Sequence, residues 1–190
     1  KEILDEYTKY VNDMLGYLGE KNTEEKAKKI VAFEKEIAKF LLTDEEQDDV
    51  TKYNNPMKVS EIAKKIKNID IQKFLKDAGV NTDNINVEEL KYYENLDKII
   101  NMSNIEVIKD YMKFQLISGS AGILDEKTSN RSFEFYGKVL SGRKERDAIE
   151  KRALDFVSEE LGEIVGKVYV EKNFSAEAKK NVSTSEQAKA

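Results

Sequence analysis

The sequence predicts an all-α fold of long antiparallel helices and short connecting helices, with at most one brief extended segment. Three observations lead to this prediction. Apolar residues recur at intervals of three and four along most of the 190-residue chain, which is the period of an amphipathic helix. Charged residues make up 36% of the chain and are mixed in sign, as on solvated helix faces. Proline, which interrupts helices, occurs once.

The first two expected helices are long and amphipathic. The first covers residues 3–18 and ends at Gly19, and the second runs as far as Leu41. Asn22 is placed to cap the second helix, with Glu25 at the reciprocal position of a capping box. The residues predicted on the two buried sides lie three or four positions apart: Ile3, Leu4, Tyr7, Tyr10, Val11, Met14, Leu15 and Leu18, then Ala27, Ile30, Val31, Glu34, Ile37, Ala38 and Leu41.

Glu34 is the exception on the apolar side of the second helix. An ionised carboxylate at a buried position needs a partner. Glu34 lies at the edge of the apolar stripe, or it takes a salt bridge or backbone hydrogen bonds. These structural roles are favoured over a catalytic acid, because the sequence specifies no second chemical group nearby. Arg131 and Arg152 are the expected basic partners.

The middle of the chain predicts shorter helices joined by polar turns. Residues 43–58 form a polar connection in which Thr43 and Glu46 make a capping box. Residues 81–87 form a loop with one brief extended stretch. The helices expected here cover residues 57–66 with Ser60 as the cap, 70–78, 89–100, and 106–117 behind a further capping box of Ser103 and Glu106.

The last third predicts one long helix after an aromatic segment. Residues 125–140 are rich in aromatic side chains and end at Ser141-Gly142, and a helix is then expected over residues 143–165. Gly162 and Gly166 lie four apart, which lets a neighbouring helix approach closely. An apolar-alternating segment follows at 167–174. The residues expected to face inward are Ile149, Ala153, Phe156, Val157, Leu161, Ile164 and Val165.

The domain organisation predicted from this pattern is one helical domain over residues 1–182 and a disordered tail over residues 183–190. The first residue is Lys1 and lies within a helical pattern, so we expect the chain to be a piece of a longer protein.

The composition excludes several kinds of site. The chain has no His and no Cys, so a His/Cys zinc site or a His-dependent nucleophile cannot be built. The net charge of −5 argues against binding nucleic acid. The longest uncharged run, Phe114 to Leu124, is too short to span a membrane. Residues 44–49 are acidic but lack the glycine of a calcium loop. We therefore assign no catalytic and no metal-binding residue to this chain.

A family resemblance is carried by the order of residues near the C-terminal end. Phe133-Glu134-Phe135-Tyr136-Gly137-Lys138-Val139-Leu140-Ser141-Gly142 is followed by Lys151-Arg152-Ala153 and by Leu161-Gly162-Glu163-Ile164-Val165-Gly166-Lys167-Val168-Tyr169-Val170, then Phe174. This order resembles the N-terminal region of the neprilysin-like zinc metallopeptidases, which include endothelin-converting enzymes and bacterial oligoendopeptidases. The residues that match its structural motif are Glu34, Arg152, Gly162, Gly166, Tyr169, Val170 and Phe174. The chain has no Trp, whereas the family commonly has one before the long helix.

The resemblance implies a function for a parent protein rather than for these residues alone. The family's zinc ligands and general base lie in a C-terminal catalytic part, in a His-Glu-x-x-His helix, which has no counterpart here. The parent would be a zinc metalloendopeptidase that cleaves oligopeptides. This region would form a helical lid over the active-site cavity, with the catalytic domain as its partner and with no cofactor or activity of its own.

Two other interpretations remain open at the level of sequence. The chain is alternatively a stand-alone helical module that binds a protein or peptide in a groove, or a purely structural helical spacer. A His-Glu-x-x-His motif downstream of Ala190 would favour the peptidase, and an early stop codon would favour the module. The Cys-free, Lys/Asn/Ile-rich composition favours a bacterial cytoplasmic protein over an exported one.

Overall fold

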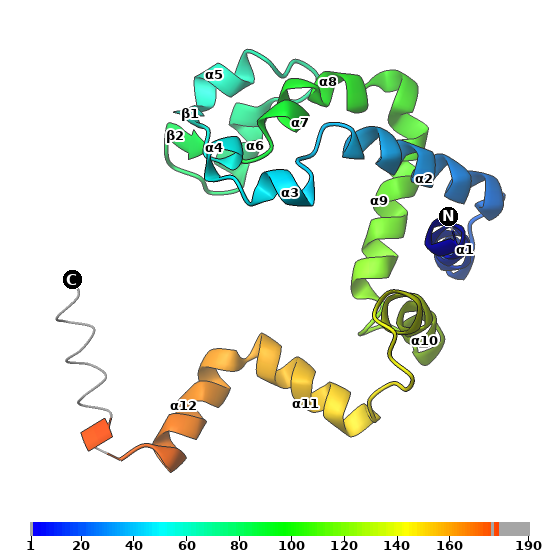
Figure 1. Cartoon of the computed structure of the whole chain (residues 1–190), viewed down its shortest axis with the longest axis vertical. Coiled ribbons are helices and arrows are strands. Elements are labelled where there is room, and N and C mark those ends of the chain that lie inside the picture. Colours follow the sequence, from blue (N-terminus) through cyan, green and yellow to red (C-terminus); the bar gives the residue numbers. More distant parts are fainter. Residues whose placement is uncertain (1, 176, 179–190) are drawn as a thin grey trace. The chain divides into compact units, whose positions relative to one another are not determined.

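The structure is a computed structural model that describes residues 2–175 and 177–178, and it confirms the all-α prediction (Figure 1). The chain divides into two compact units, residues 1–143 and 144–190. The tail predicted at 183–190 lies outside the described residues. Among the helices of the described part, none has both the length and the apolar character needed to cross a membrane.

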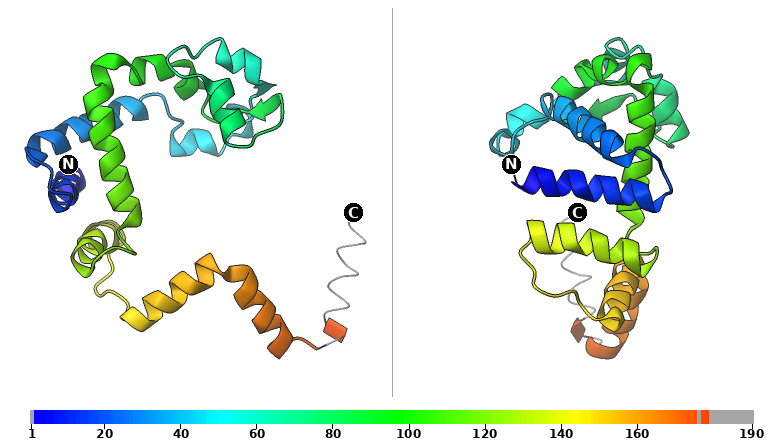
Figure 2. Two further views of the ribbon diagram at one scale, coloured as in Figure 1. Left: turned by 180° about the vertical axis from the view of Figure 1, so that it is seen from behind. Right: turned by 90° about the vertical axis from the view of Figure 1, so that its right-hand side faces the viewer.

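The first unit contains a helical body centred on α1. Figure 2 shows α1 between α2 on one side and α10 with its continuation η2 on the other, and α9 crosses α1 and α2. Gly19, with φ of +76°, supplies the left-handed turn after α1 that leads into α2. The elements of the body are α1 (Glu2–Tyr17), α2 (Thr23–Ala38), α9 (Ile105–Ser120), α10 (Glu126–Ser132) and the π-helix η2 (Phe133–Leu140).

The segment between α2 and α9 folds into short elements around a second, smaller apolar cluster built on Ile62, Ile66 and Leu96. The expected extended stretch is β2, which pairs antiparallel with β1 so that Pro56 faces Asn86. The elements are α3 (Asp44–Gln47), α4 (Val50–Tyr53), β1 (Pro56–Lys58), α5 (Val59–Ala63), α6 (Ile71–Asp77), β2 (Asn84–Asn86), α7 (Leu90–Glu94), α8 (Leu96–Ile99) and the 3₁₀ turn η1 (Met102–Asn104).

The core of the body is an aromatic cluster around Tyr10, whose side chain is completely buried. The Tyr10 ring stacks on Phe135 with centroids 5.1 Å apart, and meets Phe114 edge-on at 5.9 Å. Its hydroxyl forms a 2.8 Å hydrogen bond with the Ser118 hydroxyl of α9. The Arg131 guanidinium lies over the same ring at 5.4 Å. Residues from α1, α9, α10 and η2 therefore meet at one side chain.

The partner of Glu34 is a tyrosine. The Tyr7 hydroxyl on α1 donates a 2.8 Å hydrogen bond to Glu34 Oε1 on α2. The prediction that Arg131 fills this role is wrong, because Arg131 Nε donates instead to Asp13 Oδ2 at 2.7 Å. Arg152, the other arginine considered, lies on α11 in the second unit. The apolar spacing of α1 brought Tyr7 to the buried side, and its hydroxyl satisfies the carboxylate there.

Burial sets the pKa values of this pair. Loss of solvent raises the pKa of the Glu34 carboxyl, and the hydrogen bond from Tyr7 opposes that shift in part. The pKa of Tyr7 is also raised, first by burial and then by its hydrogen bond to Glu34 and the charge there. The pair therefore behaves as a structural link between α1 and α2.

The π-helix η2 has a steric requirement for glycine at position 137. A Cβ added to Gly137 would lie 2.4 Å from two ring atoms of Phe133, closer than real Cβ contacts. The Phe133 ring is half-buried, and the Arg143 guanidinium lies 5.6 Å from its centroid. The wider π-helical turn is thus filled by the ring of the residue four positions earlier.

Several predicted helix starts differ from the observed ones. The Thr43–Glu46 capping box is confirmed. Asn22 has a left-handed backbone with φ of 54° and makes no side-chain cap, so the box predicted with Glu25 is wrong. The Ser60 cap is also wrong, because α5 begins at Val59 after Lys58. The Ser103–Glu106 box does not form, since η1 precedes α9 and the cap position falls on Asn104.

The second unit corrects the prediction of one long helix over 143–165. Residues 143–148 are not helical, and the helix is divided into α11 (Ile149–Glu160) and α12 (Gly162–Asn173). Leu161 departs from helical geometry at φ −116° and ψ 27°. The glycine that follows has low helix propensity, which is the physical reason for a break at this point. The segment predicted as an alternating exit at 167–174 is mostly the second half of α12.

The pH dependence of stability tests the state of Glu34. Because the folded state binds the Glu34 proton more tightly than the unfolded state, ionisation lowers stability as the pH rises from the carboxyl's ordinary pKa through its raised value. The free energy of unfolding of Glu34→Gln, relative to wild type, should therefore increase between about pH 4 and pH 7. This difference in the free energy of unfolding is measured by urea titrations in which circular dichroism reports the helix content. The control is Glu36→Gln, which changes an exposed residue on the same helix. Its free energy of unfolding should stay within about 0.5 kcal/mol of the wild-type value at both pH values. A pH-independent difference for Glu34→Gln would contradict the assignment.

The clash at position 137 opposes helix propensity, which makes Gly137→Ala informative. Propensity alone favours alanine by roughly 1 kcal/mol, whereas the contact with the Phe133 ring should make the substitution destabilising by about 1–3 kcal/mol. In a Phe133→Ala background the clash is absent, so Gly137→Ala should become neutral or stabilising. A double-mutant cycle in urea measures the coupling. Equal effects in both backgrounds would show that the ring does not impose the glycine.

Candidate functional site

The residues of the predicted structural motif lie mostly on one segment. Glu34 belongs to α2 in the first unit, hydrogen-bonded to Tyr7. The other six lie on the second unit: Arg152 on α11, Gly162, Gly166, Tyr169 and Val170 on α12, and Phe174 directly after it. The motif thus marks the α11–α12 segment rather than a convergent cluster of chemical groups.

The two faces of α11 differ in character. On one face, the Lys151 ammonium lies 3.2 Å from an Asp147 carboxylate oxygen and 3.1 Å from one of Asp155. These hydrogen bonds, first the one to Asp155, raise the pKa of Lys151. The other face carries Ile149, Ala153, Phe156 and Val157, which a 3.6-residue period brings together.

The apolar residues predicted to face inward are exposed in this unit. Ile164 on α12 is 62% exposed, and Phe156 on α11 is 46% exposed. A Cβ added at Gly162 or Gly166 would meet nothing within 4 Å, so the close helix approach predicted there is not made within the second unit. At the end of α12, the rings of Tyr169 and Phe174 contact edge-on with centroids 6.2 Å apart.

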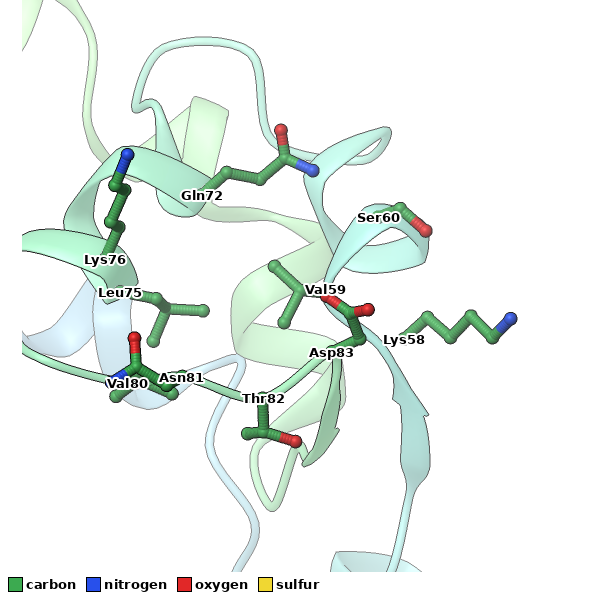
Figure 3. A pocket seen from close by; sticks show the side chains of 10 residues that line it. All are labelled: Lys58, Val59, Ser60, Gln72, Leu75, Lys76, Val80, Asn81, Thr82 and Asp83. Carbon is green, nitrogen blue, oxygen red and sulfur yellow. The ribbon is translucent and has the colours of Figure 1, made fainter.

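A polar hollow of about 440 Å³ lies in the small segment of the first unit (Figure 3). Its walls are the start of α5, the side of α6 and the loop at residues 80–83. Figure 3 shows the amino groups of Lys58 and Lys76 pointing in different directions, away from the hollow. The charged groups around it therefore do not converge on one point, and the hollow has no evident chemistry.

A larger, mainly apolar cavity of about 610 Å³ adjoins the cluster around Ile62. Phe74 on α6 is 61% exposed at its edge. Glu89, which also lines the cavity, already accepts a 2.8 Å hydrogen bond from the Leu42 backbone. The other aromatic residues in its wall are Tyr92 and Tyr93, which contact each other edge-on.

A network of four charges holds the start of α2 to α9. The Lys26 ammonium lies 2.5 Å from Glu20 and 2.9 Å from Asp110, and Lys113 reaches the other Glu20 oxygen at 2.6 Å. The hydrogen bonds from Lys113 and then from Lys26 lower the pKa of Glu20 to about 2. Sequence reasoning missed this network, because no local pattern relates residues 20 and 26 to residues 110 and 113.

The donor set of this chain does not fit a zinc ion. Zinc sites are built mainly from His and Cys, and the sequence contains neither. Among the described residues, 2–175 and 177–178, no three or more carboxylate side chains gather as metal ligands would. We therefore assign no metal-dependent step to the side chains of the described residues.

Comparison with known proteins places the chain in context. The model of peptidase family M13 matches residues 1–185. The chain is 28% identical to a neutral endopeptidase of Lactococcus lactis over 183 residues, which cover 96% of this chain and 29% of that protein. It is 25% identical to neprilysin-2 of Drosophila melanogaster, with 92% and 25% covered.

The fold has a counterpart among solved structures. The zinc metalloprotease Zmp1 of Mycobacterium tuberculosis, in its open state, matches with a TM-score of 0.84 at 24% identity, covering 96% of this chain and 29% of that one. The chain thus spans less than a third of the length of these relatives. The family match runs over almost the whole sequence and confirms the neprilysin-like resemblance. This chain belongs to peptidase family M13.

Proposed function

We propose that this chain is the N-terminal helical part of a zinc-dependent endopeptidase that cleaves oligopeptides, and that it covers the active-site cavity and restricts substrate size. The proposal is supported by family membership over residues 1–185 and by relatives described as a neutral endopeptidase and a zinc metalloprotease. The zinc and the groups that activate water would be held by polypeptide outside this chain, because a His-free sequence cannot supply a His-Glu-x-x-His helix.

The packing of the first unit supports a covering role. A cover that selects substrates by size must keep its shape, and interlocked helices provide this. Tyr10 joins α1 to α9 and η2, Tyr7 joins α1 to Glu34 on α2, and Lys26 joins α2 to Asp110 on α9. A rigid cover that closes over a cleft excludes water and bulky substrates by steric exclusion.

We also propose that the parent is a bacterial cytoplasmic protein, because the chain has no Cys and is rich in Lys, Asn and Ile.

The division of activity between this chain and its parent is directly testable. We expect the full-length product of the gene to hydrolyse a short internally quenched peptide, to lose that activity on treatment with a chelator, and to regain it with Zn²⁺. The purified 190-residue chain should give no zinc-dependent cleavage. A full-length product without such cleavage would contradict the proposal and favour the stand-alone interaction module, and cleavage by the 190 residues alone would show that catalytic groups lie within them.

Size restriction has its own measurement. The full-length protein should cleave the quenched peptide but not the same sequence placed in a surface loop of a folded carrier protein, and urea-unfolding the carrier before dilution should restore cleavage. Unfolded fragments of the carrier that contain the same loop are the matched control, because they keep the residues on either side of the cleavage sequence without the folded structure. Equal rates on the peptide and on the folded carrier would rule out a size-selecting cover while leaving the peptidase assignment intact.

A further inference from the structure

The two edges of the β1–β2 ribbon differ in what they can bind. In an antiparallel pair, residues alternate between those bonded to the partner strand and those whose N–H and C=O point away from it. At one end of the ribbon, the Val59 N–H donates to the Asp83 carbonyl at 2.9 Å. At the other end, the Val87 N–H donates to the Asn55 carbonyl at 3.2 Å. The alternation between these pairs leaves four residues with backbone groups that point outward: Pro56 and Lys58 on β1, and Asn84 and Asn86 on β2.

The outer edge of β1 cannot donate to a further strand. Pro56 has no backbone N–H. The Lys58 N–H is already used, because it donates to Glu61 Oε2 at 2.9 Å. Proline is one of the residues with which natural proteins close a strand edge. An added strand would therefore find no free donor on β1.

The outer edge of β2 is open at Asn86. The Asn84 N–H donates to Thr82 Oγ1 at 3.2 Å and is thus already used. The Asn86 backbone N–H and C=O make no hydrogen bond with the residues that the structure describes, and the residue is exposed. Its side-chain amide is held elsewhere, because it donates to the Tyr53 carbonyl and accepts from the Asn55 N–H. Unpaired edge groups of this kind are a template for an added strand.

An apolar cavity adjoins this open edge. Asn86 is one of the residues that line the cavity of about 610 Å³ in the small segment. Ligand sites in proteins have volumes of roughly 300–1,000 Å³ and mainly apolar walls. The walls here include Ile69, Phe74, Leu75 and Tyr93. The cavity can therefore accept an apolar or aromatic side chain from a molecule that pairs with the β2 edge.

The charge around the cavity is negative. The charged side chains in its lining are Glu88 and Glu89, and among the described residues no lysine or arginine lines it. Glu89 Oε2 accepts the Leu42 N–H at 2.8 Å, whereas Glu88 is exposed. Residues 43–104, which supply nearly all of the walls, carry 13 acidic residues against 9 lysines, and this is most of the chain's net charge of −5. A surface of one sign attracts ligands of the opposite sign, so the site favours a basic ligand.

These features together select one kind of occupant. An extended peptide brings amide groups for the edge at Asn86, an apolar side chain for the cavity and a basic side chain for Glu88. An alkylamine lacks the amide groups, and a fatty acid has the wrong charge. The helices α11 and α12 cannot add a strand, because their backbone groups are bonded within each helix. A basic, apolar oligopeptide is therefore the favoured occupant.

We propose that the β2 edge at Asn86 and the adjoining cavity bind an extended oligopeptide that carries an apolar or aromatic residue beside a lysine or arginine. The inference rests on the proposed function, because oligopeptides are the substrates of the parent in that proposal. It deepens that function by naming a substrate class and a contact that this chain makes. The peptide backbone pairs with the Asn86 N–H and C=O, its apolar side chain enters the cavity, and its basic group lies near Glu88.

Nuclear magnetic resonance titration of the 190-residue chain with a blocked peptide, Thr-Lys-Phe-Lys-Thr, tests the site. We expect the amide shifts of residues 84–89 to change and those of α1 to stay constant. Replacing the peptide's Phe by Ala should weaken binding by about tenfold, because the apolar area buried is lost. Methylating two successive backbone nitrogens of the peptide should weaken it by about fivefold, because a hydrogen bond to the β2 edge is lost. Unchanged affinity for either altered peptide, or no change at residues 84–89, would overturn the proposal.

Reversal of one charge localises the basic group of the peptide. Glu88→Lys should weaken binding of Thr-Lys-Phe-Lys-Thr by about fivefold and strengthen binding of Thr-Glu-Phe-Glu-Thr. Glu45→Lys is the matched control, because it changes an exposed acidic residue of α3 and alters the net charge by the same amount. It should leave the preference for the lysine peptide in place. Equal effects of the two variants would show that the charge of the whole chain attracts the peptide, which contradicts the proposal.

Other occupants of the site give different results. If the remaining polypeptide of the parent fills it, the full-length protein, kept inactive by a chelator, will not bind the peptide that the 190-residue chain binds. If a second copy fills it, the shifts of residues 84–89 will depend on protein concentration without peptide. Either result overturns the proposal. Cleavage of the quenched peptide by the full-length protein is measured separately. Cleavage without binding at residues 84–89 refutes the site alone, and binding without cleavage refutes the proposed function alone.

Discussion

The first unit depends on the complete burial of Tyr10. Because α1 places this ring among Phe114, Phe135 and the Arg131 guanidinium, three other helices are fixed against α1 at once. The ring supplies apolar area, and its hydroxyl still finds a partner in Ser118. A smaller apolar residue would leave both a void and an unpaired serine hydroxyl. The Tyr7–Glu34 hydrogen bond and the Lys26 network then add polar links to a geometry that this cluster already determines.

Local sequence patterns predicted most of the fold, and the reason is physical. The helices α1, α2 and α9 follow from the 3.6-residue spacing of apolar residues, which requires no knowledge of the neighbours. The Thr43–Glu46 box was predictable for the same reason, since both partners lie within one turn. What depends on distant residues was not predictable: Arg131 pairs with Asp13, and Glu34 is satisfied by a tyrosine 27 positions earlier. The left-handed backbone of Asn22 was not predictable either, because it depends on how the chain turns from α1 into α2.

The motif residues illustrate the same division. Their order along the chain identified the family, but it could not indicate that Leu161 interrupts the helix or that Ile164 faces solvent. Periodicity states which side of a helix is apolar, and it does not state what covers that side. In the first unit the cover is the neighbouring helix, as with Met14 and Leu15 of α1, which are fully buried. Within the second unit itself, the same kind of pattern has no such neighbour.

The short ribbon of β1 and β2 has a consequence for how this family domain can vary. Pro56 faces Asn86, and the Asn55 amide group binds the carbonyl of Val87, so the chain leaves and re-enters the segment at nearly one point. Residues 59–83, which lie between the two strands, therefore form a segment whose two ends stay adjacent whatever its length. The segment also packs against an element outside it, because Ile62 and Ile66 share the second apolar cluster with Leu96 of α8. Evolution can therefore lengthen or shorten the exposed loop between α6 and β2 without separating the ends of the segment, whereas the residues that contact Leu96 have to be kept.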